Sequence, residues 1–171
     1  MIASAGITSR TFLMTGLQSG TTYQFRVQAR NIIGYGTPST AVSILCATIT
    51  SRPSAPTTHV NVNNVIVTWT APLSDNGAAV TAYQVLIRQA DLVTYSQDTV
   101  NCNGANDLIR AALTCSIPMT TLTAAPFSLP TGASVFAQII AINAMGASQT
   151  SDAGNGAVLS ISTVPSAPVG L

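Results

Sequence analysis

The chain has 171 residues, of which 47% are apolar, so it has enough material for a buried core and is excluded from the intrinsically disordered class. Only 6% of the residues are charged and the net charge is +1, with no Lys or Glu, which leaves no basic surface for nucleic acid or an anionic membrane. No apolar run reaches the roughly 18 residues of a membrane span, and the opening MIASAGITSR lacks the features of a secretory signal.

The rest of the composition favours β-structure. Thr, Val, Ser, Ala, Asn and Gly dominate, while the Lys and Glu that helix surfaces use are absent. The low charge has two interpretations. Neighbouring molecules or glycan cover the surface, or an extracellular domain stays soluble through its hydroxyl and amide groups.

The first predicted strand lies in the stretch YQFRVQA, residues 23–29. Its apolar positions recur at every second residue, which is typical of a strand with one buried face. These positions are Tyr23, Phe25, Val27 and Ala29. Asn31 and Gly34 follow, and we expect them in a tight turn, where Asn bonds nearby backbone groups and Gly takes a positive φ.

Further strands are predicted in the middle of the chain. NNVIVTWTAP (63–72) and VTAYQVLIRQ (80–89) both read as strands, and DLVTYSQDTV (91–100) is a less regular candidate. Residues on one face of the first of these are Val65, Val67 and Trp69. The loop before the second contains turn-forming residues, which are Pro72, Asn76 and Gly77.

The sequence repeats after 112 residues. Twelve of the forty positions from 17 to 56 recur without a gap at this spacing, including Leu17 as Leu129 and Asn31 as Asn143. The phrase A-x-N-x-x-G recurs, so Gly34 matches Gly146, and PSAP stands at 53–56 and again at 165–168. The second copy also has apolar residues at period two, at Val135, Ala137, Ile139 and Ala141. A fixed period predicts one structural unit of about 112 residues.

These motifs together resemble the fibronectin type III domain. They read V-x-W-x-x-P, then NG, then A-Y-x-V, then L-x-x-G-x-x-Y-x-F-x-V-x-A-x-N-x-x-G. The residues that carry the resemblance are Val67, Trp69, Pro72, Asn76, Gly77, Tyr83, Val85, Leu17, Gly20, Tyr23, Phe25, Val27, Ala29, Asn31 and Gly34.

The resemblance implies an all-β fold, an immunoglobulin-like antiparallel sandwich in which strands A, B and E pack on strands C, C′, F and G. Residues 1–51 would be strands E, F and G of one domain, residues 52–163 a complete domain, and residues 164–171 the first strand of a third, in a tandem array. The complete unit is about twenty residues longer than is usual for the family. The surplus is expected between Asn101 and Ser128.

Half a sandwich cannot cover its own inner face. We therefore expect residues 1–50 to be completed by a partner, either the remainder of a longer tandem array or a different chain. Other copies of the protein and further domains of the same chain are the predicted partners, and Pro53 and Pro56 are expected to stiffen the linker between units.

Cys102 and Cys115 flank the surplus segment. A disulfide between them would tie down a long connection, and two unpaired small apolar side chains are the alternative. Cys46 is left over, and it is either free or bonded to a neighbouring chain. The 112-residue spacing matches it to Val158 and so predicts that it faces away from Ala47 and Ile49.

Catalytic and cofactor chemistry is not indicated. His59 is the single histidine, and a plain strand position explains it better than a triad or a metal site. The five Asp residues are isolated, with no calcium-loop spacing, and no glycine loop opens a helix to hold phosphate. We expect no cofactor, no metal and no enzyme activity.

Glycosylation on Asn is excluded, because no N-x-S/T sequence occurs. O-linked glycan remains possible, since Ser and Thr make up 40 of the 171 residues and several lie beside proline.

Three functions fit these observations, all at the cell surface or outside the cell. The first is a structural protein, a repeat-built subunit of a fibre or surface filament. The second is an adhesion or receptor-type binding module that uses exposed loops, and the third is a spacer in a secreted enzyme acting on polysaccharide. The low charge and the gapless repeat favour the fibre.

Overall fold

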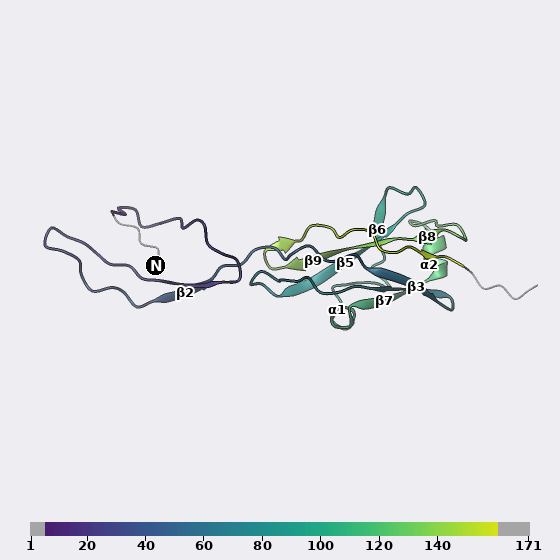
Figure 1. The fold of residues 1–171 in the computed structure, drawn as a ribbon, viewed down its shortest axis with the longest axis horizontal. Coiled ribbons are helices and arrows are strands. Elements are labelled where there is room, and N and C mark those ends of the chain that lie inside the picture. Colours follow the sequence, from purple (N-terminus) through teal and green to yellow (C-terminus); the bar gives the residue numbers. More distant parts are fainter. Residues whose placement is uncertain (1–5, 161–171) are drawn as a thin grey trace, which may run out of the picture.

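A computed structural model describes residues 6–160 of the chain in two parts (Figure 1). Residues 6–50 form an extended, ribbon-like segment, which we call the arm. Residues 51–160 form a β-sandwich, and the two parts follow one another along the long axis of the molecule. The predicted first strand of a third domain, residues 164–171, lies outside the described residues.

The sandwich consists of two antiparallel layers. One sheet has the order β3-β4-β7, with strands at Thr57–Asn61, Asn64–Thr68 and Thr114–Pro118. The other has the order β10-β9-β5-β6, with strands at Gly146–Ala147, Ala137–Asn143, Val80–Arg88 and Tyr95–Gln97. A short pair, β8 (Ser134–Val135) and β11 (Ala157–Val158), extends the second layer. The all-β sandwich expected from the sequence is thus confirmed, with A, B and E facing C, C′, F and G.

The core follows from the period-two alternation of the strands. In β8 and β9, the inward residues Val135, Ala137, Ile139 and Ala141 are all 0% exposed. Val65, Val67 and Trp69 lie buried on one face of β4 and the residue after it, as predicted. The Trp69 ring meets the Tyr83 ring edge-on at 5.6 Å between centroids, and Val85 and Leu129 complete this part of the core. Aromatic pairs in this geometry add to the stabilisation from buried area.

The surplus segment contains structure that the sequence analysis did not assign. Strand β7 lies inside it, preceded by helix α1 (Asp107–Ala112) and followed by helix α2 (Met119–Thr123). The Oδ1 atom of Asn106 caps α1 by accepting from the Leu108 N–H at 2.9 Å, and Leu113 ends the helix in the left-handed conformation. A disulfide joins Cys102 to Cys115, with the two Cα atoms 5.2 Å apart.

The same segment closes one side of the sandwich. The Tyr83 N–H donates to the Gly104 carbonyl at 3.0 Å, and the Trp69 N–H donates to the Leu113 carbonyl at 3.0 Å. The inserted chain therefore occupies the edge of β5 beyond the end of β6. This bond pairs an edge group of β5 that would otherwise be open to another strand.

Side chains close the opposite side, where β3 lies beside the last strand. Asn155 accepts from the Thr58 N–H through Oδ1 at 2.6 Å and donates from Nδ2 to the Thr58 carbonyl at 2.9 Å. The Thr58 hydroxyl donates to the Val135 carbonyl and accepts from the Ala157 N–H. One amide and one hydroxyl thus take the place of a backbone ladder.

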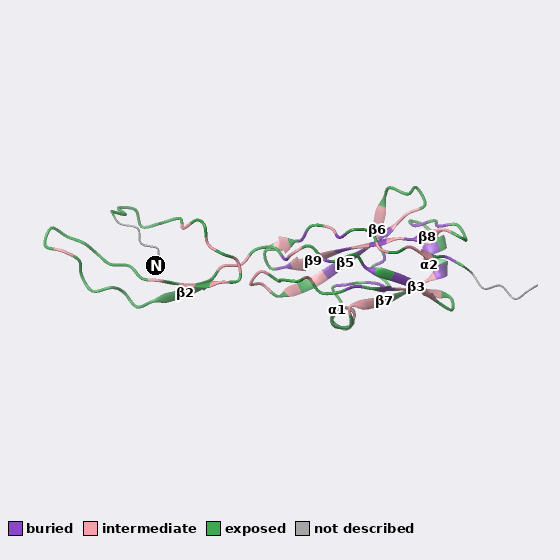
Figure 2. Cartoon of the chain, viewed as in Figure 1, coloured by how far each residue is buried: buried purple, intermediate pink, exposed green. Residues whose placement is uncertain are grey.

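The arm has two strands, β1 (Thr22–Phe25) and β2 (Val42–Leu45), which pair with each other. No strand is present over residues 6–21, so the strand E expected within residues 1–51 is not seen in the part of the arm that the structure describes. Most of the arm is exposed, in contrast to the sandwich (Figure 2). Val27 is 75% exposed, although its counterpart Ile139 is fully buried. What covers this face stays a prediction.

The backbone confirms that the arm repeats β8 and β9, with one correction to the register. Ser39 bonds Val27 through both its N–H and its Oγ, and Ser151 bonds Ile139 in the same way. Beyond these serines the copies differ by one residue, because Cys46 N–H donates to Thr21 O whereas Leu159 N–H donates to Ala133 O. Cys46 therefore corresponds to the buried Leu159, and the match to Val158 was wrong. A one-residue slip exchanges the two faces of a strand.

The disulfide yields a stability prediction. Replacing Cys102 and Cys115 together by Ala is expected to lower the free energy of unfolding by about 3 kcal/mol, because the cross-link restricts a long loop in the unfolded chain. Urea unfolding followed by Trp69 fluorescence measures this. The single variant Cys46→Ala is the control, since Cys46 lies in the arm and is free. A double variant as stable as the control would contradict the prediction.

Gly104 yields a second stability prediction. A Cβ atom at this position would lie 2.3 Å from the Tyr83 carbonyl oxygen, so Gly104→Ala has to displace the backbone of the inserted segment. We expect it to cost about 1–3 kcal/mol in urea unfolding. Ala105→Ser, at the exposed next residue, is the matched control and is expected to stay within about 0.5 kcal/mol of the parent. Equal stability of the two variants would be inconsistent with this close approach.

Candidate functional site at the joint between the arm and the sandwich

Within residues 6–160, no three His, Cys or Asp side chains lie together in a way that could hold a metal ion. His59 is an exposed residue of β3. No described helix has the length and apolar character needed to cross a membrane.

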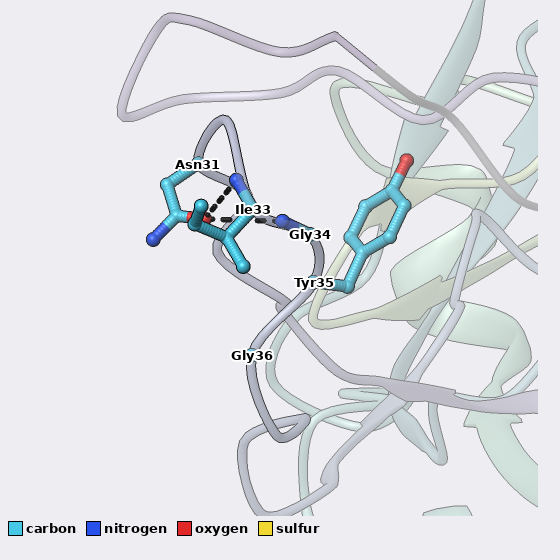
Figure 3. Close-up of a pocket in the computed structure, with 5 residues that line it drawn as sticks. All are labelled: Asn31, Ile33, Gly34, Tyr35 and Gly36. Atoms are coloured by element: carbon cyan, nitrogen blue, oxygen red, sulfur yellow. Dashed lines mark hydrogen bonds between the residues drawn. The ribbon is translucent and has the colours of Figure 1, made fainter.

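A shallow depression of about 260 Å³ lies at the turn of the arm (Figure 3). It is lined by Asn31, Ile33, Gly34, Tyr35 and Gly36. The Asn31 Oδ1 atom is occupied by the N–H groups of Ile33 and Gly34, at 2.9 and 3.1 Å. None of the five lining residues is charged.

Asn31 and Gly34 therefore occupy the turn that the sequence predicted. Gly34 has a φ of 153°. Tyr23 has a local role as well, because its hydroxyl accepts from the Gln18 N–H at 2.8 Å, next to the half-buried Leu17. Phe25 lies on the same face as Tyr23. The motif L-x-x-G-x-x-Y thus fixes the chain before β1, a role that the sequence analysis did not assign.

The polar groups of the chain converge at the joint, where residues 46–52 meet the sandwich. Two backbone bonds link the chain to the loop between β4 and β5. Thr48 N–H donates to the Asn76 carbonyl at 3.1 Å, and Ser51 N–H donates to the Ser74 carbonyl at 2.9 Å. The Asn76 side chain returns a bond from Nδ2 to the Ile49 carbonyl at 2.7 Å. The linker is therefore held along its length.

Asn143 is the centre of the joint. Its side chain is buried, with 4% of the residue exposed. The Nδ2 atom donates to the Thr48 carbonyl at 2.8 Å and lies 3.2 and 3.3 Å from the carbonyls of Asp75 and Ala78. Its Oδ1 accepts from the Met145 N–H at 2.9 Å. One side chain thus connects the arm, the β4–β5 loop and its own turn.

Two glycines allow the parts to approach closely. Gly77 has a φ of +85°, and a Cβ there would lie 2.9 Å from the Cys46 carbonyl oxygen and 3.0 Å from the Gly20 Cα. Asn76 before it also has a positive φ of 52°, and the pair occupies the centre of a turn closed by Ala78 N–H and Asp75 O. Asn-Gly is the dipeptide that such a turn prefers. Gly146 lies against Ile49 on the other side.

Charge contributes little at the joint. Arg52 donates from Nε to the Thr150 carbonyl and forms an ion pair with Asp152 at 2.6 Å. The Asp152 side chain is 79% exposed, and exposed pairs of this kind contribute about 0–1 kcal/mol. Neutral amide and carbonyl groups therefore provide most of the contact.

Two titratable groups elsewhere have shifted pKa values with structural causes. Burial raises the pKa of the Tyr83 phenol above 10.0, and the nearby positive charge of Arg110 partly offsets this. The Thr94 hydroxyl, followed by the backbone N–H groups of Val93 and Thr94, lowers the pKa of Asp91 below 3.8. Asp91 thus stays ionised and holds the loop between β5 and β6.

Of the residues singled out from the sequence, Asn143 and Gly146 lie at the joint, whereas Asn31 and Gly34 lie at the opposite tip of the arm. Cys102 and Cys115 are bonded, and Trp69, Tyr83, Val85 and Leu129 are in the core. The sequence analysis missed the joint itself. The recurrence of the Asn-Gly dipeptide and the A-x-N-x-x-G phrase marks turns, but nothing local indicates that two turns meet a linker.

Comparison with known proteins points to one family. Residues 3–44 match the model described as Fibronectin type III domain. Contactin-5 of Gallus gallus is 41% identical over 83 residues, and Exoglucanase B of Cellulomonas fimi is 34% identical over 90 residues. These matches cover 45% and 47% of this chain, and 8% of each relative. The chain therefore spans less than a tenth of these two relatives.

The fold has a counterpart among solved structures. A crystal structure of three titin domains superimposes with a TM-score of 0.54 at 19% identity, covering 85% of this chain and 43% of that one. Similarity at this level of identity supports the fold alone.

The joint yields a prediction with an internal control. Asn143→Ala removes the amide that donates to the Thr48 carbonyl and lies beside the carbonyls of Asp75 and Ala78. These carbonyls would then lack a hydrogen-bond donor, so we expect a loss of about 1–3 kcal/mol in the free energy of unfolding. Asn31→Ala is the matched change, since the Asn31 side chain also accepts within its own turn but bonds no linker, and a smaller loss is expected. Urea unfolding of both variants measures this. Equal losses would mean that Asn143 acts only as a turn residue.

Proposed function

We propose that this chain, which belongs to the fibronectin type III domain family, is a structural segment of an extracellular tandem array that holds successive units at a fixed distance and angle. The observation that carries the proposal is the joint. A linker that only connected two domains would need no partners, whereas Thr48, Ile49 and Ser51 all bond the sandwich through their backbone.

The closed sides of the sandwich support a rod-like element. The inserted segment covers the edge of β5, and the Asn155–Thr58 contacts close the opposite side. Backbone bonded in this way is not open to a neighbouring strand, whereas β6 and β7 are the outermost strands of their sheets.

The outer sheet faces are surfaces that arrays would use for lateral contacts in a fibre or surface filament. The outward positions of β5 and β9 include half-buried Leu86, Ile140 and Ile142, with Arg88 directed over the Phe136 ring at 4.2 Å. Few charges oppose such a contact, since only 6% of the residues are charged.

An extracellular or cell-surface location is part of the proposal. The Cys102–Cys115 disulfide supports it, because disulfides form and persist in oxidising compartments. The proposal assigns no reaction to the chain.

A binding module is the second candidate, and one loop favours it. Between β5 and β6, Leu92 and Val93 are 65% and 80% exposed, and Leu92 has a positive φ of 65°. Asp91 holds this loop by accepting from Val93 and Thr94. An apolar residue kept exposed in a conformation that it rarely adopts is a candidate contact for another protein.

Amide hydrogen exchange tests the joint. The Thr48 and Ser51 N–H groups are expected to exchange roughly a hundredfold more slowly than the N–H of Ile32, which is in the exposed turn of the arm. Equal rates would mean that the linker moves freely, and the chain would then be a flexible string instead of a rod. Electron microscopy of the native protein provides the second test, with a constant angle between units expected.

A further inference from the structure

The chain contains three Asn-Gly pairs, which begin at Asn76, Asn103 and Asn155, and none of them lies within a helix or strand. In such a pair no side chain shields the glycine nitrogen, so it can attack the carbon of the asparagine amide. We propose that Asn103-Gly104 is a site of spontaneous modification by water, which converts the Asn103 amide into a carboxylate. The site does not depend on the proposed array.

The chemistry has two steps. The Gly104 nitrogen gives up its proton to the solvent and bonds to the Asn103 side-chain carbon, whose amide nitrogen takes up a proton and leaves as ammonia. Water then opens the cyclic imide, adding its hydroxyl to one of the two ring carbonyls and returning a proton to the Gly104 nitrogen. Opening on one side gives aspartate. Opening on the other gives isoaspartate, whose main chain passes through the side-chain carbon and is therefore longer.

The surroundings of Asn103 favour the first step. The residue is exposed, and its Oδ1 atom accepts from the Ala105 N–H at 3.0 Å. This bond folds the amide back along the main chain and polarises its carbonyl, as a fixed donor does for a developing oxyanion. The Gly104 N–H has no acceptor among residues 6–160, so no bond of this nitrogen has to break before it reacts.

The pair at Asn76 lacks this freedom. The Asn76 Nδ2 atom donates to the Ile49 carbonyl at 2.7 Å, and the Gly77 N–H donates to the Asp75 carboxylate at 2.9 Å. The carboxylate disfavours loss of the Gly77 proton, because the nitrogen would become negative beside a negative charge. Both groups that have to react are therefore occupied.

The pair at Asn155 is held by β3. The Asn155 Oδ1 atom accepts from the Thr58 N–H at 2.6 Å and from the Thr58 hydroxyl at 3.1 Å, while Nδ2 donates to the Thr58 carbonyl at 2.9 Å. The amide has to leave Thr58 before the Gly156 nitrogen can attack it. Groups protected in this way react only when the structure opens locally.

Conversion at Asn103 affects the contact that pairs the edge of β5. Gly104 is buried, and its carbonyl accepts from the Tyr83 N–H at 3.0 Å. Even a Cβ atom on Gly104 would lie 2.3 Å from the Tyr83 carbonyl oxygen, so a longer main chain before this residue cannot keep the fit. The isoaspartate form is therefore expected to lose the bond to Tyr83, whereas the aspartate form keeps it.

Ageing of the full 171-residue chain in mildly alkaline buffer tests the site. We expect Asn103 to react at least about tenfold faster than Asn76 and Asn155 in the folded chain, and all three to react at similar rates in concentrated urea. After reduction, mass spectrometry of a tryptic digest locates each conversion. Trypsin does not cleave before Pro53, so the three pairs fall in separate peptides, residues 31–88, 89–110 and 111–171.

Amide hydrogen exchange at Tyr83 tests the structural effect. The Tyr83 N–H is expected to exchange about tenfold faster in the isoaspartate form than in the unmodified chain. The variant Asn103→Asp is the matched control, since it adds the charge without lengthening the main chain, and its Tyr83 N–H should exchange at the parent rate. Equal conversion at the three pairs in the folded chain, slower conversion at Asn103, or unchanged Tyr83 exchange in the isoaspartate form would each overturn the proposal.

Discussion

The constraint on which the rest of this structure depends is that the apolar face of a β-sheet has to be covered. In the sandwich a three-stranded sheet lies over β8 and β9, and every inward residue from Val135 to Ala141 is fully buried. The arm repeats the same alternation with only two strands, and Val27 remains largely in solvent. The same local pattern therefore forms a core in one part of the chain and an uncovered face in the other.

Much of the fold could be predicted because its signals are local. Alternation at Val65, Val67 and Trp69 and the Asn-Gly turn require no knowledge of distant residues. The surplus segment could not be predicted in this way. Strand β7 has five residues, and its position depends on pairing with β4, while Gly104 is required by contact with Tyr83, twenty-one residues earlier. Helix α1 depends on the Asn106 cap and on Leu113 adopting a left-handed conformation.

The one-residue slip between the two copies of the repeat has a physical cause that a comparison of their residues does not reveal. The last strand of the sandwich has few ladder bonds and is held by the Asn155 side chain, so an additional residue is accommodated between Ser151 and Leu159. Ala41 and Ala153 lie before the slip, because Gly154 N–H donates to Ala137 O at the position where Val42 pairs with Phe25 in the arm. Because faces alternate at period two, this slip places Cys46 on the side of the core.

The two A-x-N-x-x-G turns show how one motif acquires a second role. In both, the Asn side chain accepts from backbone N–H of its own turn, from two groups at Asn31 and from one at Asn143, which is a local property. Only Asn143 also donates to a linker, because the β4–β5 loop brings the carbonyls of Asp75 and Ala78 beside Thr48. This contact is buried and neutral, so salt screens it far less than an exposed ion pair. The angle between the parts is therefore set by amide geometry and the two close glycines, and not by charge.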